Sequence, residues 1–261
     1  MDLGLAGKVA LVSGGASNIG RAISMVLAGE GAHVAILDRD VMQAEKTAGE
    51  IAAAGGKASV HGVDVTEIAA VDAAVAEVEA AHGAPDVLVN NVGWNGDARF
   101  FLDLEPERWE KAYRLNLFPT FALTRAVLGR MRDRRAGSIV SIASDAAFGE
   151  HRVADYGAMK AGVATFMRSI AKEYGRFGVR ANTVAPGLVI PDEADIGEGS
   201  LWQQQVGFGP KEIQYMEASI PLKRRPEALD IAWTVAFLAS ERARMLTGQI
   251  VSVSGGFNMP R

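Results

Sequence analysis

Short, continuous apolar runs alternate with longer segments of helical spacing along most of this 261-residue chain. A strand buried on both faces of a parallel sheet reads as such a run, whereas an amphipathic helix repeats its apolar residues about every three or four positions. The pattern predicts seven strands, at 8–13, 33–37, 57–63, 86–89, 138–143, 179–184 and 249–253. It predicts about six helices, at 19–27, 41–54, 67–82, 107–131, 154–177 and 226–238. This alternation indicates one α/β domain, in which helices flank a doubly wound, seven-stranded parallel sheet.

One segment breaks the regular pattern. The stretch from Leu188 to Lys211 follows the sixth predicted strand and contains four glycines and two prolines among polar residues. A long irregular insert in a regular fold usually carries a function, often as a lid over a ligand. We therefore expect residues 188–225 to form a loop that closes over a substrate.

Composition and charge exclude several classes of protein. The formal net charge is −4, so the chain offers no basic stripe for a nucleic acid backbone. Cysteine is absent, which excludes disulfides and thiolate nucleophiles, and the four histidines are scattered, so we expect no metal site. No apolar run is long enough to span a membrane, and the N-terminus lacks the apolar stretch of a signal peptide. We expect a cytoplasmic protein that binds neither nucleic acid nor membranes.

The ends of the first two predicted strands carry the signs of a nucleotide site, because ligands of open parallel sheets bind at the carboxyl ends of the strands. The first strand runs into S-G-G-A-S-N-I-G at 13–20, where Gly14 allows a tight turn and Gly20 allows the next helix to pack closely. The N-terminus of that helix offers N–H groups to a pyrophosphate. Asp38 stands 18 residues beyond Gly20, where a carboxylate can accept hydrogen bonds from adenosine ribose hydroxyls. A glycine-rich turn alone is often only a turn, but together with Asp38 it predicts a dinucleotide site.

Tyr156 and Lys160 are four residues apart in a segment of helical spacing, so both side chains lie on one helix face. A free tyrosine has a pKa of about 10, and roughly 3 to 4 kcal/mol of preferential phenolate stabilisation would make it a base near neutral pH. The neighbouring ammonium can supply part of this energy. Taken alone, a half-buried tyrosine beside a solvated lysine explains the same spacing.

Several motifs occur along the chain in order: the turn at 13–20, D-V at 64–65, N-N-V-G at 90–93, R-L-N-L at 114–117, S-I-A-S at 141–144, the Tyr156 and Lys160 pair, and P-G at 186–187. Together they resemble the short-chain dehydrogenase/reductase family along essentially the whole chain. The resemblance implies a single-domain Rossmann fold, a homotetramer, hydride transfer to or from NAD(P), and a catalytic tetrad of Asn116, Ser144, Tyr156 and Lys160. It places the cofactor against Gly14, Ser17, Asn18, Ile19, Asp38, Asp64, Val65, Asn91, Gly93, Tyr156, Lys160 and Val189.

The resemblance also implies roles for the tetrad. Tyr156 acts as acid or base toward the substrate oxygen, which Ser144 holds in place, while Lys160 lowers the pKa of Tyr156 and binds the nicotinamide ribose. Asn116 interrupts its long helix so that its backbone carbonyl can hold a water molecule. Asn18 stands where the family usually has a glycine, but asparagine tolerates a left-handed backbone better than most side chains. Pro191 replaces a frequent threonine, which removes a hydroxyl near the nicotinamide.

Cofactor choice and substrate rest on fewer residues. Asp38 would face the 2′-phosphate of NADP, so we expect NAD. The segments 90–94 and 141–150 and the terminal S-V-S-G-G are locally similar to dehydrogenases of alicyclic hydroxyacyl-CoA thioesters, in particular 2-hydroxycyclohexanecarboxyl-CoA dehydrogenase. An aromatic enclosure for a ring is offered by Trp94, Phe148, Trp202 and Phe208, although these could instead fill a small core of the insert. Phosphates of CoA could meet Lys211, Lys223, Arg224 and Arg225, which could equally be solvated charges.

The sequence thus predicts an NAD-dependent short-chain alcohol dehydrogenase with a small-molecule substrate. It would interconvert a cyclic or bulky secondary alcohol, such as an alicyclic alcohol or hydroxyacyl-CoA, and its ketone. The main alternative is a 3-oxoacyl-thioester (ACP or CoA) reductase, although that class usually prefers NADP. A distant alternative is a non-catalytic NAD-binding regulator or subunit, from which we would expect loss of Ser144, Tyr156 or Lys160.

Overall fold

Seven parallel strands form one sheet in the computed structural model, which describes residues 2–191, 197–198, 200 and 209–259. The strand order is β3-β2-β1-β4-β5-β6-β7, so β1 pairs with both β2 and β4. The strands are β1 (Val9–Ser13), β2 (His33–Asp38), β3 (Lys57–Gly62), β4 (Val87–Asn90), β5 (Gly137–Ile142), β6 (Val179–Pro186) and β7 (Ile250–Val253). The predicted doubly wound Rossmann fold is confirmed.

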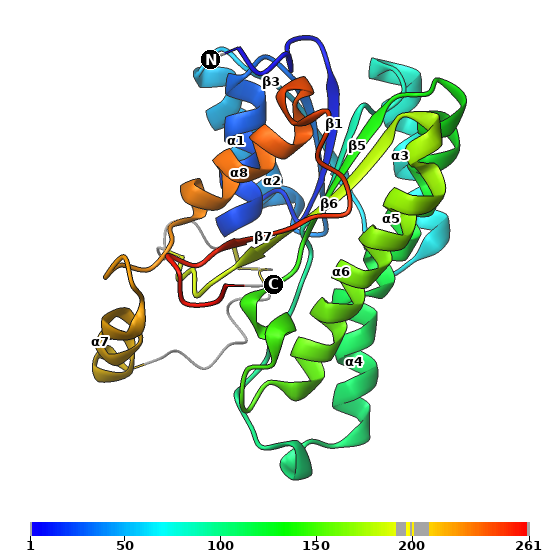
Figure 1. Cartoon of the computed structure of the whole chain (residues 1–261). Coiled ribbons are helices and arrows are strands. Elements are labelled where there is room, and N and C mark those ends of the chain that lie inside the picture. The colour runs from blue at the N-terminus through cyan, green and yellow to red at the C-terminus, as the bar shows by residue number, and fades with distance from the viewer. Residues whose placement is uncertain (1, 192–196, 199, 201–208, 260–261) are drawn as a thin grey trace.

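Helices cover both faces of this sheet (Figure 1). The described helices are α1 (Asn18–Gly29), α2 (Val41–Ala53), α3 (Ile68–His82), α4 (Pro106–Asn116), α5 (Phe118–Asp133), α6 (Ala154–Tyr174), α7 (Pro210–Ser219) and α8 (Ala228–Ala239). One core contains residues of α1, α2 and α8, and the other contains residues of α3, α5 and α6. Two apolar layers therefore enclose the sheet.

Strand β1 shows why the apolar runs are continuous. Ala10 and Val12 lie in the core beneath α1 and α8, whereas Val9 and Leu11 lie in the core beneath α3 and α5. All four are buried. Because successive strand residues point to opposite faces, a strand covered on both sides needs an apolar residue at every position.

The single helix predicted at 107–131 is wrong, because two helices meet at Leu117. Pro119 lies in the first turn of α5 and has no N–H to donate to the carbonyl oxygen of Leu115, four residues earlier. The Asn116 side chain lies in the last turn of α4, where its Nδ2 donates to the carbonyl oxygen of Ala112 at 2.9 Å. The predicted interruption at Asn116 therefore has a cause in the neighbouring proline.

Apolar residues lie on more than one face of the helices predicted at 107–131 and 154–177, which favours packing of these helices against a second copy. Of the residues that carry this argument, Leu123, Val127, Val163 and Ile170 are buried in the internal core and are at most 5% exposed. The interface argument from these four is therefore wrong, whereas the remaining three, Phe118, Phe121 and Phe166, are only partly buried. The side chains exposed near the start of α4 are instead Phe100 (65%), Phe101 (54%), Leu102 (94%) and Trp109 (38%). The homotetramer itself stays a prediction.

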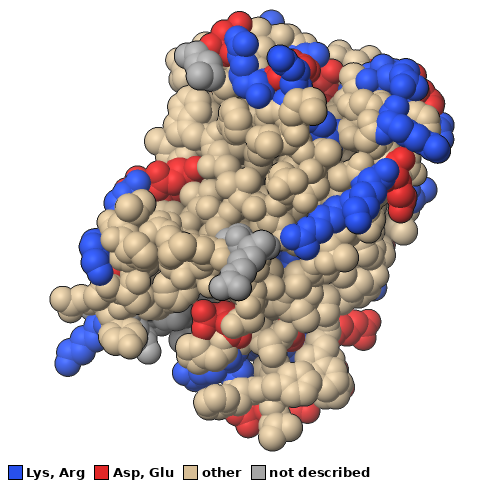
Figure 2. Space-filling model, viewed as in Figure 1, with Lys and Arg blue, Asp and Glu red and all other residues tan. Residues whose placement is uncertain are grey.

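Charged residues lie in several separate groups on the face shown in Figure 2. A basic run at 130–135 lies at the end of a helix, since α5 stops at Asp133. Arg130 pairs with Glu79, and Arg134 donates to the carbonyl oxygen of Ala84. Among the described helices, none combines the length and apolarity needed to cross a membrane.

The predicted loop at 188–225 is described only in part. It contains α7, which stands apart from the sheet in Figure 1. Trp202 and Phe208, two of the four aromatic residues expected around the substrate, lie outside the described residues. The role of this loop as a lid stays a prediction.

Candidate active site

A cavity of about 960 Å³ opens at the carboxyl ends of the strands, where the strand order switches between β1 and β4. This is the place where open α/β sheets bind ligands. The described lining comes from the segments that follow β1, β2, β3, β4, β5 and β6, together with the first turns of α6 and residues of α7. Every predicted cofactor residue lines it: Gly14, Ser17, Asn18, Ile19, Asp38, Asp64, Val65, Asn91, Gly93, Tyr156, Lys160 and Val189.

The turn after β1 is held tightly in place. Gly14 has a φ of +60°, and a Cβ atom on Gly20 would lie only 1.8 Å from the carbonyl oxygen of Gly14. Asn91 Nδ2 donates to the carbonyl oxygens of Ser13 and Gly14, at 3.1 and 3.0 Å. The two glycines therefore allow α1 to begin directly against the turn, with its N-terminus in the cavity.

Asn18 fits the cofactor implied by the resemblance. It adopts a φ of +44°, the left-handed conformation expected for this position. Its side chain is buried, and neither amide atom has a hydrogen-bond partner among the described residues. Ser17, the N-cap of α1, also makes no side-chain capping bond. Buried polar atoms normally find partners, so this end of the cavity suits a phosphate that supplies acceptors.

Asp38 ends β2 and ties this strand to the turn. Its Oδ2 accepts the Ala16 N–H at 3.2 Å, and its Oδ1 accepts the Asp40 N–H at 3.0 Å. Burial raises the pKa of Asp38, while these backbone donors lower it. A carboxylate has about four acceptor positions, so two ribose hydroxyls can still bind. Asp64, after β3, is exposed and accepts hydrogen bonds from the Thr66 N–H and hydroxyl.

Ser144, Tyr156 and Lys160 come together at the inner end of the cavity. Ser144 caps the short helix after β5, where its Oγ accepts the Ala146 N–H at 3.2 Å, and it forms a side-chain hydrogen bond with Tyr156. Lys160 is 2% exposed, and its Nζ donates to the carbonyl oxygen of Ile142 at 3.0 Å. The Nζ lies 5.7 Å from the centre of the Tyr156 ring. Three of the four predicted catalytic residues therefore share one site.

Burial opposes ionisation of both members of the Tyr156 and Lys160 pair. It raises the pKa of Tyr156 to about 12, although the hydrogen bond with Ser144 lowers it, and it lowers the pKa of Lys160 to about 8. Moving a proton from the phenol to the amine across this gap costs about 5 kcal/mol. Attraction between the two charges, near 6 Å and at an effective dielectric constant of about 20, offsets roughly 3 kcal/mol. The remainder must come from groups that bind in the cavity.

Asn116, the fourth predicted catalytic residue, binds the backbone of the loop after β4 and does not line the cavity. It is 1% exposed, its Oδ1 accepts the Trp94 N–H at 2.9 Å, and its Nδ2 donates to the Trp94 carbonyl oxygen at 2.8 Å. A Cβ atom on Gly93 would lie 2.8 Å from Lys160 Nζ and 3.2 Å from Asn116 Oδ1. Gly93, just after β4, therefore lies close to the side chains of both Asn116 and Lys160 and leaves no room for a side chain of its own.

The expected aromatic enclosure is present in part. Trp94 lines the cavity but is only 7% exposed, with Lys111 Nζ lying 4.2 Å from its ring centre. Phe148 is 37% exposed and is not among the described residues that line the cavity. Its contact with substrate stays a prediction, as do those of the undescribed Trp202 and Phe208.

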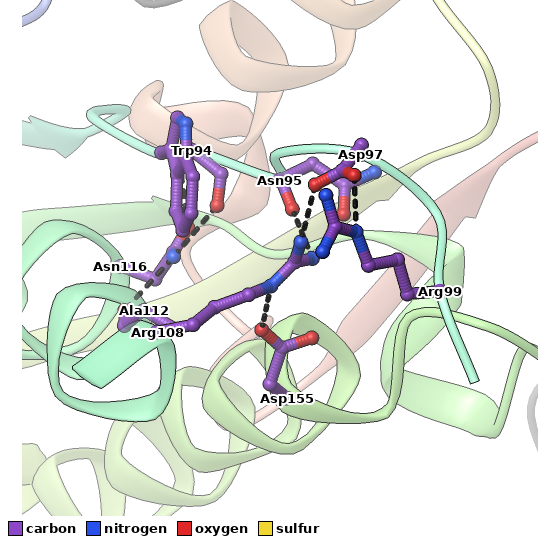
Figure 3. A network of polar contacts seen from close by, with 8 residues as sticks. All are labelled: Trp94, Asn95, Asp97, Arg99, Arg108, Ala112, Asn116 and Asp155. Atoms are coloured by element: carbon purple, nitrogen blue, oxygen red, sulfur yellow. Dashed lines mark hydrogen bonds and ion pairs between the residues drawn. The ribbon is translucent and has the colours of Figure 1, made fainter. Parts of the chain in front are cut away.

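The sequence did not reveal a polar network beside this site, in which Arg108 meets Asp97 and Asp155 (Figure 3). Asp155 directly precedes Tyr156, but its partner Arg108 lies 47 residues earlier in the chain. No periodicity signals such a pairing. The only hint in the sequence was the carboxylate directly before Tyr156. Arg152 was also missed, and it lines the cavity from the loop before α6.

Comparisons with known proteins agree with this geometry. A family model described as enoyl-(acyl carrier protein) reductase matches residues 14–258. The 2,3-dihydro-2,3-dihydroxybenzoate dehydrogenase of Bacillus subtilis is 34% identical over 258 residues, which cover 97% of both chains. Two relatives are 35% identical over 97% of this chain and 98% of their own: the (2S)-[(R)-hydroxy(phenyl)methyl]succinyl-CoA dehydrogenase subunit BbsD of Thauera aromatica and the 3-oxoacyl-[acyl-carrier-protein] reductase FabG of Staphylococcus aureus.

Solved structures share the fold closely. A crystal structure from Burkholderia xenovorans, assigned to the short-chain dehydrogenases/reductases, superposes with a TM-score of 0.87 at 35% identity and covers 97% of each chain. One from Agrobacterium tumefaciens, assigned as a gluconate dehydrogenase, has a TM-score of 0.89 at 29% identity and covers 97% of this chain and 96% of its own. Similarity to these proteins thus extends over the whole described sheet and its helices.

The packing at Gly20 yields a test of the nucleotide end. We expect Gly20→Ala to push α1 away from the turn, destabilise the protein by about 1 to 3 kcal/mol and weaken NADH binding at least tenfold. Gly29→Ala is the matched control, because a Cβ atom there meets nothing within 4 Å on the same helix. Thermal unfolding and titration of NADH fluorescence measure both effects. Wild-type affinity in Gly20→Ala would contradict the assigned role of this turn.

Proposed function

Because this chain belongs to the short-chain dehydrogenase/reductase family, we propose that it is an NAD-dependent alcohol dehydrogenase acting on a secondary alcohol or, in reverse, on its ketone. One observation carries the proposal: Ser144, Tyr156 and Lys160 line the same cavity as Asp38 and the α1 N-terminus. A dinucleotide bound in this cavity could meet both groups. Members of the family use NAD(P) cofactors, and we propose that this chain prefers NAD.

The chain's own residues supply the proton chemistry. In oxidation, Tyr156 as phenolate accepts the hydroxyl proton of the alcohol, while the Ser144 hydroxyl holds the substrate oxygen in line. The carbinol carbon loses its hydrogen together with both C–H electrons, and bound NAD supplies the acceptor for this hydride. Lys160 favours the phenolate by its charge. In reduction, the Tyr156 phenol returns the proton to the carbonyl oxygen.

The preference for NAD rests on Asp38. Its carboxylate lines the cavity and is fixed by the Ala16 and Asp40 amides. A 2′-phosphate placed within a few ångströms would be repelled by about 1 to 4 kcal/mol, which is roughly a fivefold to several-hundredfold discrimination. This repulsion supports NAD over NADP.

For the substrate, we propose a cyclic or bulky secondary alcohol, in the free form or as a CoA thioester. The names of two relatives refer to a dihydroxylated ring and to a phenyl-bearing succinyl-CoA. FabG acts on 3-oxoacyl carrier-protein thioesters, so the relatives support that alternative equally. The local similarity to 2-hydroxycyclohexanecarboxyl-CoA dehydrogenase belongs to this proposal and not to the assignment of the family.

Most of the cations that could meet the phosphates of CoA already have partners within the chain. Arg224 pairs with Asp230 at 2.8 Å, Arg225 pairs with Glu217 at 2.6 Å, and Lys223 donates to a backbone carbonyl at 2.7 Å. Lys211, which lines the cavity, is the member of that group best placed to meet a phosphate. These contacts weaken the case for CoA and leave the free alcohol as a strong candidate.

We also propose the homotetramer expected from the family resemblance. The exposed Phe100, Phe101, Leu102 and Trp109 form an apolar group beside α4 that a second copy could cover. Sedimentation at micromolar concentration distinguishes a tetramer from a monomer.

The proposed reaction predicts the behaviour of Tyr156→Phe. Removing the hydroxyl deletes the acid/base group but leaves the turn at 13–20 and Asp38 in place. We expect NAD turnover to fall at least 100-fold while the dissociation constant for NADH changes less than threefold. Retention of more than about a tenth of the activity would remove Tyr156 from this role. Wild-type protein that binds NADH but oxidises no alcohol would favour the non-catalytic alternative.

Cofactor choice is tested with Asp38→Asn, which removes the charge but keeps the shape and one acceptor oxygen. We expect wild-type kcat/KM to favour NAD over NADP by at least tenfold, and the variant to lose most of this preference. Steady-state kinetics with both cofactors give the ratio. Equal or better efficiency with NADP in the wild type would contradict the proposal.

The substrate class is tested by comparing three compounds under the same NAD concentration. These are a cyclic 2-hydroxyacyl-CoA, the corresponding free cyclic alcohol and a linear 3-hydroxyacyl-CoA. We expect either cyclic compound to give the highest kcat/KM. A tenfold advantage for the linear thioester would replace the ring substrate with the fatty-acyl alternative.

A further inference from the structure

Arg108 joins three separate segments of the chain (Figure 3). From α4, its Nε donates to Asp155 Oδ2 at 2.8 Å and its Nη1 donates to Asp97 Oδ1 at 2.6 Å. Its Nη2 donates to the carbonyl oxygen of Asn95 at 3.2 Å. One planar guanidinium thus meets three acceptors, which an ammonium on a lysine chain could not reach together.

The Arg108–Asp155 pair of this network is buried, whereas the side chain of Asp97 is 32% exposed. The Arg108 side chain is 12% exposed and that of Asp155 is 1% exposed. Asp155 Oδ1 has no hydrogen-bond partner among the described residues, so Arg108 is the compensating charge that the structure gives Asp155. Breaking a buried pair on one side leaves an unpaired charge, which is far more disruptive than loss of an exposed pair.

The two carboxylates belong to segments with different tasks. Asp155 lies in the first turn of α6, directly before Tyr156. Asp97 lies in the loop after β4, whose residues Trp94, Asn95 and Ala98 line the cavity. Arg108 therefore connects the turn that carries the acid/base group to a wall of the substrate space.

The Asp97 side of the network has further support. Arg99 also donates to Asp97, and this hydrogen bond holds the pKa of Asp97 below its usual range, with the charge of Arg108 adding to the effect. Because a lowered pKa keeps the carboxylate ionised at neutral and alkaline pH, the contact is intact wherever the proposed reaction would run. The Arg108 guanidinium also lies 5.5 Å from the centre of the Trp94 ring.

We propose that Arg108 is a positioning residue with two separable arms. Its Asp155 arm holds the turn of Tyr156 and governs kcat. Its Asp97 arm holds the loop at 94–99 against the cavity and governs KM for the substrate. The kinetic part of this inference rests on the proposed function, whereas the structural part does not.

The test separates the arms by single charge removals. We expect Asp155→Asn to lower kcat about tenfold with KM changed less than twofold, and Asp97→Asn to raise KM about tenfold with kcat changed less than twofold. We expect Arg108→Met both to lower kcat and to raise KM. Arg108→Lys keeps the positive charge but loses the forked guanidinium, so we expect it to restore only one of these two parameters. Arg125→Met is the matched control, because Arg125 pairs with Asp72 on the surface, where the side chains are 60% and 47% exposed.

Amide hydrogen exchange gives a second measurement that needs no turnover. We expect Asp97→Asn to speed exchange in residues 95–103 alone, and Asp155→Asn to speed it in residues 153–158 alone. If the wild type oxidises no alcohol but these segments respond separately, the proposed function fails and the two-arm network stands. If both variants change the same kinetic parameter and the same segment, or neither differs from Arg125→Met, the inference is overturned. Should Arg108→Met not fold, Arg108→Lys and the two asparagine variants still decide between these outcomes.

Discussion

The candidate site depends on one buried ammonium group. Lys160 is 2% exposed, and the described structure gives its Nζ the carbonyl oxygen of Ile142 as a hydrogen-bond partner but no carboxylate. Burying an uncompensated charge costs several kcal/mol, and the fall of the Lys160 pKa to about 8 expresses that cost. A buried ammonium without a carboxylate partner is stabilised by any negative charge that develops beside it. The candidate for that charge in this site is the phenolate of Tyr156.

The fold creates that position from parts far apart in the sequence. The end of β5 supplies the Ile142 carbonyl, α6 supplies Lys160 and Tyr156, and the end of β4 supplies Gly93, where any Cβ atom would meet Lys160 Nζ at 2.8 Å. Another buried charge near the site is paired instead with an opposite charge. Asp155, in the same turn as Tyr156, is paired directly with Arg108. One buried charge is thus neutralised to hold geometry, while the other is left uncompensated where chemistry is proposed.

Much of the fold could be predicted from the sequence, because the central strands β1, β2, β4, β5 and β6 are largely buried on both faces and so leave continuous apolar runs, whereas the edge strands β3 and β7 are only partly buried. The nucleotide end could also be predicted, since its glycine turn and Asp38 lie at strand ends that the pattern places together. The helix break at Leu117 was readable from Pro119, but the apolar spacing continues through it, so only the family resemblance predicted an interruption there, at Asn116. The burial of Leu123 and Val163 could not be read, since periodicity does not say whether a face meets the sheet or another copy. The Arg108 network was out of reach because only tertiary structure brings residues 97, 108 and 155 together.

The most direct measurement is the pH dependence of kcat/KM for alcohol oxidation, at saturating NAD, in the wild type and in Lys160→Met. Oxidation needs the Tyr156 phenolate, so activity rises with pH until the phenol in the complex is ionised. In the complex, where the bound groups keep Lys160 protonated while the phenol ionises, the ammonium contributes roughly 3 kcal/mol of attraction, and its removal should move this rise upward by about 2 pH units. The position of the rise is informative even if the variant is much slower. A rise at the same pH in both proteins would contradict the claim that Lys160 supports the phenolate.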